Sequence, residues 1–239
     1  MHRFNPIKSG IVEFLGCFAL MFFGTFQTNM PDDLKERRNF FYENAIINLF
    51  IYMVMMWLGA KYSGSQFNPM LSLSLLSLGE IPFSIAIVNL ASQAAGAFFG
   101  LFYLGLVSNY QESYFNSYKV GMFAAIFIEF LVSFTLSLVY FITFCHKQAD
   151  RSVYAFAVPA VYAMFTISIG NLFYTRFNLI LFIAHSVLSF DFQPNFFSIL
   201  IGSILGSTVA LILYIILTAE TKKIGQALPM TDEDNQIKF

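Results

Sequence analysis

Two hydrophobic runs are separated by Ser63-Gly64-Ser65-Gln66-Phe67-Asn68-Pro69-Met70-Leu71, a stretch of small, polar and turn-forming residues that decides the fold. The apolar run that follows ends at about Leu78 and is too short to cross a bilayer, because a crossing needs about 20 apolar residues. Asn68 suits the N-cap of a helix, and Pro69 suits the first helical position, where a missing N–H has no cost. We therefore expect a re-entrant half-helix whose positive end points at the membrane midplane, where pores and binding sites are built.

The same arrangement occurs a second time at Arg176-Phe177-Asn178-Leu179-Ile180-Leu181. Upstream, Glu13-Phe14-Leu15-Gly16-Cys17-Phe18-Ala19-Leu20 lines up with Glu129-Phe130-Leu131-Val132-Ser133-Phe134-Thr135-Leu136, with Glu, Phe, Leu, Phe and Leu at matching positions. Each half therefore consists of three spans, with a half-helix between its second and third. Because three is an odd number, we expect the second half to sit inverted in the membrane.

The composition is that of a membrane protein. Of the 239 residues, 57% are hydrophobic and 11% are charged, whereas roughly a quarter of the residues of a soluble domain are charged. We expect an integral, multi-pass protein surrounded by membrane lipid, in the plasma membrane or in an organelle, including the mitochondrial inner membrane. The formal net charge of −1 provides no basic surface for nucleic acid.

Chemistry-bearing constellations are missing from the sequence. It contains no nucleophile–base arrangement, metal-ligand cluster or phosphate-binding loop, so we expect neither an enzyme nor a bound metal or cofactor. Cys17 and Cys145 lie in or beside apolar segments without metal-ligand spacing. We expect both to be ordinary thiols and not a disulfide.

Hydropathy and turn residues predict the extent of each element. The six predicted spans lie at about 10–28, 44–60, 81–107, 120–144, 153–169 and 194–217, and the half-helices at 68–78 and 178–190. A charged loop is predicted at 32–38 and a polar tail at 218–239. Eight Lys and Arg residues fall on the side of the termini and five on the other side, which favours termini on the inside of the membrane.

The chain resembles an aquaporin, or major intrinsic protein, over nearly its whole length. The stretch from Ser63 to Met70 is similar to the family's SGAHxNPA loop, Ala91-Ser92-Gln93-Ala94-Ala95-Gly96-Ala97 to its third-span AQxxGA pattern, and Glu129-Phe130-Leu131 to its fourth-span glutamate motif. The second half departs from the family. Asn178-Leu179-Ile180-Leu181 stands where the family has Asn-Pro-Ala-Arg, and Gly202-Ser203 replaces a glycine-proline pair.

The resemblance implies one all-α, aquaporin-like domain over 1–239, with an inverted repeat at about 9–107 and 120–217. It implies pore asparagines that donate to a file of water, in motifs formed by Asn68, Pro69 and Met70 and by Asn178, Leu179 and Ile180. It also implies an outer selectivity constriction at Asn48, Thr166, Thr175 and Leu181, so that Leu181 replaces the family's arginine. Two carboxylates, Glu13 and Glu129, are implied to hold the pore loops by accepting backbone N–H bonds, the alternative being a place at the lipid interface.

Two further residues and the function itself leave alternatives open. Arg176 either replaces the missing positive charge or turns to the interface or a partner, and His185 is either a packed polar residue or a gate. The first function hypothesis is a channel for water and small neutral solutes, with low water permeability because of Leu181, and by resemblance a homotetramer. The alternative is a pore-degenerate, non-conducting structural subunit of a larger membrane assembly.

Overall fold

The computed structural model describes residues 4–25, 34–107, 120–145, 153–170, 172–173, 175, 177–188, 192 and 195–227. The first half of the chain forms four α-helices: α1 (Pro6–Phe22), α2 (Leu34–Gly59), α3 (Pro69–Ser77) and α4 (Phe83–Val107). The second half repeats this order with α5 (Met122–Tyr140), α6 (Tyr154–Ile169), α7 (Leu179–Leu188) and α8 (Phe196–Ala227). A 3-10 turn at Phe23–Thr25 follows α1, and a π-helical segment at Phe141–Cys145 continues α5.

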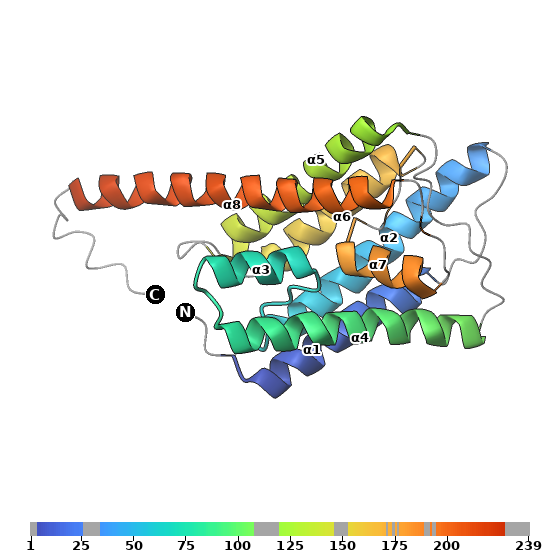
Figure 1. The fold of residues 1–239 in the computed structure, drawn as a ribbon, viewed down its shortest axis with the longest axis horizontal. Coiled ribbons are helices and arrows are strands. Elements are labelled where there is room, and N and C mark those ends of the chain that lie inside the picture. The colour runs from blue at the N-terminus through green and yellow to red at the C-terminus, as the bar shows by residue number, and fades with distance from the viewer. Residues whose placement is uncertain are drawn as a thin grey trace.

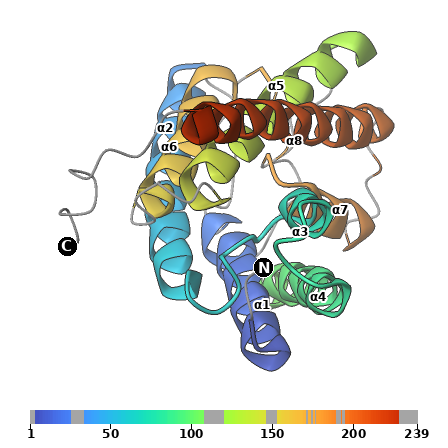
Figure 2. The same ribbon diagram turned by 90° about the vertical axis from the view of Figure 1, so that its left-hand side faces the viewer.

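Among the described residues, six helices are longer and two are short, as the aquaporin-like fold requires. The most extensive packing pairs α1 with α4, α5 with α8, and α2 with α6. The short helices α3 and α7 lie in line between α4 and α8, as both the side view and the end-on view show (Figures 1 and 2). The predicted arrangement of six spans and two re-entrant half-helices is confirmed.

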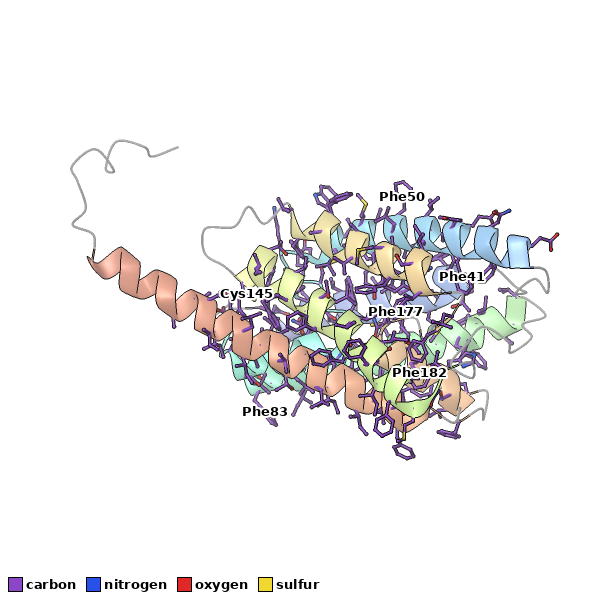
Figure 3. All side chains as sticks on the ribbon, turned by 90° about the horizontal axis from the view of Figure 1, so that it is seen from above. Phe41, Phe50, Phe83, Cys145, Phe177 and Phe182 are labelled. Carbon is purple, nitrogen blue, oxygen red and sulfur yellow. The ribbon has the colours of Figure 1, made fainter. Side chains whose placement is uncertain are left out.

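In the part of the chain that the structure describes, five helices are long and apolar enough to cross a membrane, and α6 is shorter, with 16 residues. At 1.5 Å per residue α6 is about 24 Å long, and it packs beside α2. Large apolar side chains cover the outside: Phe50 is 59% and Phe83 is 67% exposed, while Phe177 and Phe182 lie inside the bundle (Figure 3). Such a surface suits lipid and not water, and the chain is an integral, multi-pass membrane protein.

Glycines allow the paired helices to approach closely in both halves. A side chain at Gly96 would collide with the Phe14 carbonyl on α1, and one at Gly206 would collide with the Phe130 carbonyl on α5. Phe14 and Phe130 are the matching residues of the repeated glutamate motif. Close contact at small residues is therefore made in the same way by α1 with α4 and by α5 with α8.

Two helix boundaries differ from the prediction by about ten residues each. Helix α2 begins at Leu34 and not near residue 44, so that most of the predicted charged loop is helical. Helix α8 continues to Ala227, into the predicted polar tail. The hydropathy pattern marks only the part of a helix that lies in lipid, whereas Lys, Glu, Arg and Gln are good helix formers and extend both helices beyond it.

Candidate pore site

Each half-helix begins at its motif asparagine. The Asn68 side-chain oxygen accepts the Met70 N–H at 3.0 Å, and Pro69 is the first helical residue. In the second half, the Asn178 side-chain oxygen accepts the Ile180 N–H at 3.2 Å, and α7 begins at Leu179. Leucine in the place of proline therefore still permits a capped helix start, because leucine is a good helix former.

The residue before each asparagine adopts an unusual backbone conformation. Phe67 has φ +47° and Phe177 has φ +46°, in the left-handed region that bulky residues rarely occupy. Both rings are buried, so packing holds this local strain in place. The nearly equal angles show that the two motifs share one turn geometry, which directs both asparagine side chains to the centre of the bundle.

The two asparagines differ in the partners of their amide nitrogens. The Asn178 nitrogen donates to the Phe67 carbonyl at 2.7 Å, which joins the two motifs, and to the Tyr52 hydroxyl at 3.0 Å. Since a side-chain amide carries two N–H bonds, both donors of Asn178 are occupied by protein. Within the described residues, the Asn68 nitrogen has no such acceptor, and Asn68 lines a central cavity.

The central cavity lies between the two halves and is lined by residues of α2, α3, α5, α6 and α8 and of both pore loops. The volume open to the centre of a water-sized sphere is about 20 Å³. On this measure a cavity of about 10–15 Å³ is enough for one water molecule. Its polar lining comprises Gln66, Asn68, Tyr52, Tyr162, Ser133, Ser137 and Ser207. The Ser137 hydroxyl donates to the Ser207 hydroxyl at 3.0 Å across α5 and α8.

Glu13 of α1 lies beneath the first pore loop and is fully buried. Its two carboxyl oxygens accept the backbone N–H groups of Gln66 at 2.8 Å and Phe67 at 2.7 Å. The Gln93 amide of α4 donates to it at 2.8 Å. Three donors offset the cost of burying a carboxylate away from water, and they tie the turn before Asn68 to α1 and α4.

Glu129 of α5 holds the equivalent place in the second half, with different partners. Its oxygens accept the hydroxyl of Thr175 at 2.9 Å and that of Ser203 at 3.1 Å, whereas the expectation was backbone N–H donors. Ser203 lies 110 positions after Gln93, the same interval that separates Asn68 from Asn178. Ser203, in the place of the family's proline, therefore donates to Glu129 as Gln93 donates to Glu13. The 110-residue interval between the two halves was the signal that could have identified it.

The four predicted constriction residues are all buried, and none of them lines the central cavity. The Asn48 amide donates to the Asn44 backbone and side-chain oxygens at 2.9 and 3.0 Å, and Thr166 donates to the Tyr162 carbonyl at 3.0 Å. Thr175 donates to Glu129, as described above, and Leu181 packs in the apolar core. The polar groups of this set are therefore directed at the protein.

Of the two residues with open alternatives, the structure describes only His185. His185 is buried in the last turn of α7, while Arg176 lies outside the described residues. Neither Cys17 nor Cys145 is part of a disulfide, and the buried Cys17 thiol donates to the Phe67 carbonyl at 3.5 Å. Across the described part of the chain, no group of three or more His, Cys, Asp or Glu side chains could hold a metal ion.

Sequence reasoning missed the tyrosines that surround the motifs. Tyr52 and Tyr162 pack with ring centroids 5.2 Å apart, and they too are separated by 110 positions. Tyr140 donates to the Gly64 carbonyl at 2.8 Å and Tyr154 to the Met56 carbonyl at 3.0 Å, so that second-half side chains hold the first pore loop and the end of α2. In the sequence, only the 110-residue interval shared with Asn68 and Asn178 pointed to the Tyr52–Tyr162 pair.

Comparison with known proteins agrees with this geometry. Residues 1–214 match the family described as Major intrinsic protein, and the chain belongs to this family, whose members are membrane channels. Among solved structures, the aquaglyceroporin from Plasmodium falciparum matches 88% of this chain and 96% of its own, with a TM-score of 0.69 and 20% identity. At this identity the likeness concerns the fold. No curated protein matches the chain.

Proposed function

We propose that this protein is a membrane channel for water and small neutral solutes with a low water permeability per subunit. One observation carries the proposal: the two half-helices meet at the centre, and the Asn68 amide lines a cavity of water size. The positive ends of both helices point at this place, which disfavours cations and protons. A neutral molecule that accepts a hydrogen bond is the ligand that this site suits.

Among its described residues, the second half lacks polar groups that would assist passage at the constriction positions. Leu181 is apolar and buried in the place of an arginine, so a passing water molecule finds no cation and no multiple donor there. Asn48, Thr166 and Thr175 retain polarity, but their described donors already have protein acceptors. Water leaving bulk solvent would therefore lose hydrogen bonds at this point and gain few, which slows its passage.

The alternative is a non-conducting structural subunit of a larger membrane assembly. The bond between Asn178 and Tyr52 favours it, because this bond removes one of the two pore donors. By family resemblance we further propose a homotetramer in lipid, which native mass spectrometry of the detergent-solubilised protein would test. A larger, mixed assembly in the native membrane would instead support the structural role.

Osmotic swelling of proteoliposomes with a known protein content tests the function. We expect water flux above that of empty liposomes and below that of an arginine-bearing aquaporin, and lower flux for Asn68→Asp, which replaces the free amide donor with a carboxylate. Flux equal to that of a fast water channel would contradict the low permeability. No flux of water, glycerol or urea through correctly folded protein would favour the structural subunit.

A further inference from the structure

We propose that the Tyr52–Tyr162 pair is the permeability-determining barrier of this channel, with the Tyr52 hydroxyl in the place of a water molecule bound to Asn178. The inference rests on the proposed channel function and assigns its low permeability to a pair of residues other than Leu181. It follows from the position of the pair, from the space between the rings and from the hydrogen bond to the motif asparagine.

The pair separates the central cavity from the constriction positions. The Tyr154 hydroxyl bonds the Met56 carbonyl, so the beginning of α6 lies beside the end of α2 and the two helices run in opposite directions. Met56 and Val158, one turn to one side of the pair, line the cavity. Asn48 and Thr166 lie one turn to the other side on the same helices and do not line it. The Tyr52–Tyr162 pair therefore lies between the two regions along α2 and α6.

The space between the two rings is too small for water. Their centroids are 5.2 Å apart with an interplanar angle of 39°, within the range of paired aromatic rings. Subtracting a carbon–carbon contact distance of about 3.5–4.0 Å leaves about 1.2–1.7 Å, whereas a water molecule is about 2.8 Å across. Phe177 packs edge-on against Tyr162 with centroids 6.0 Å apart, and this contact restricts the movement of that ring.

The hydroxyl of Tyr52 adds a chemical barrier to this steric one. It accepts the second N–H of Asn178 at 3.0 Å, while the first N–H is held by the Phe67 carbonyl. A water molecule can bind Asn178 only after it displaces this hydroxyl. Tyr52 is 8% and Asn178 is 2% exposed, so the displaced groups have little access to solvent in which to find other partners.

Water permeability of proteoliposomes, normalised to reconstituted protein, tests the barrier with Tyr52→Val, Tyr162→Val and the double variant. We expect the double variant to exceed wild type by at least about tenfold, which corresponds to a barrier lower by about 1.4 kcal/mol. Tyr103→Val is the matched control, because Tyr103 is 46% exposed on the outer face of α4. The Leu181→Gln variant keeps the tyrosine pair, and its water permeability is expected to stay within about twofold of the wild-type value. A twofold change corresponds to a barrier difference of less than about 1 kcal/mol.

Variants are compared only as monodisperse protein. Where a valine variant does not fold, Tyr52→Leu and Tyr162→Leu replace it, since leucine retains more of the apolar packing volume. The barrier assignment would be overturned if folded variants of the tyrosine pair had the wild-type water flux, or if Leu181→Gln alone raised the flux. Either result would leave the proposal of a slow channel in place. Fast flux through the wild-type protein would overturn the proposed low permeability itself, so the two failures are distinct.

Discussion

Replacing Glu13 with leucine is expected to prevent most of the protein from folding. The carboxylate accepts two backbone N–H groups, from Gln66 and Phe67, and the Gln93 amide. Leucine removes these three acceptor contacts in a fully buried place. A buried donor left without an acceptor costs about 1–3 kcal/mol, so the loss is about 3–9 kcal/mol if the site does not rearrange. This is comparable to the whole stability of a typical protein, about 5–15 kcal/mol.

The folded yield, measured as the monodisperse fraction after solubilisation, is the assay for this effect. Phe50→Leu is the control, because Phe50 is 59% exposed on the outer face and its replacement leaves no buried polar group without a partner. The folded yield of Glu13→Gln should lie between those of Glu13→Leu and Phe50→Leu. The glutamine carbonyl oxygen still accepts a hydrogen bond, while its NH₂ group faces one of the former donors. Equal yields of Glu13→Leu and Phe50→Leu would refute the reasoning and place Glu13 at the lipid interface.

Three further predictions follow from single contacts. Ser203→Ala removes a hydroxyl donor from buried Glu129 and should lower the unfolding temperature by an amount equivalent to about 1–3 kcal/mol; an unchanged temperature would remove Ser203 from the site. Gly206→Ala places a methyl group against the Phe130 carbonyl and should reduce the free energy of unfolding by about 1–3 kcal/mol. Gly105→Ala should not reduce it, because Gly105 has open space around it; equal effects of the two variants would argue against close α5–α8 packing. An impermeant maleimide should label Cys145 from the side of the termini and leave buried Cys17 unlabelled; labelling of Cys145 only from the opposite side would contradict the six-span topology.

The two halves of the pore site have diverged in how they solve the same physical problem. Each has a buried carboxylate on its first helix that must be satisfied in a medium without water. Glu13 is satisfied by backbone N–H groups and a glutamine, and Glu129 by two hydroxyls among the described residues. The second half thus keeps its architecture with Leu179 and Leu181 in its motif, while Asn178 donates to the Tyr52 hydroxyl.

Much of the fold could be predicted from the sequence because it depends on local chemistry. Apolar length marks the lipid-crossing part of each helix, and an odd number of spans per repeat requires inversion. The starts of α3 and α7 were also predictable, since Asn68 and Asn178 cap the residues that follow them directly. The helix ends beyond the apolar spans at Leu34 and Ala227 were not, because the length of an apolar run says nothing about where a helix ends in water.

The amino-acid sequence alone determined the membrane class, the inverted repeat, the half-helix starts and the residues that differ from the family, since each follows from composition or short-range spacing. Only the tertiary structure decided which groups meet. Asn178 and Tyr52 are 126 positions apart, Tyr140 and Gly64 are 76 apart, and Ser203 and Glu129 are 74 apart. Such pairs form only when whole helices are rotated and seated correctly against one another, because a hydrogen bond requires its two atoms within a few tenths of an ångström of about 2.9 Å.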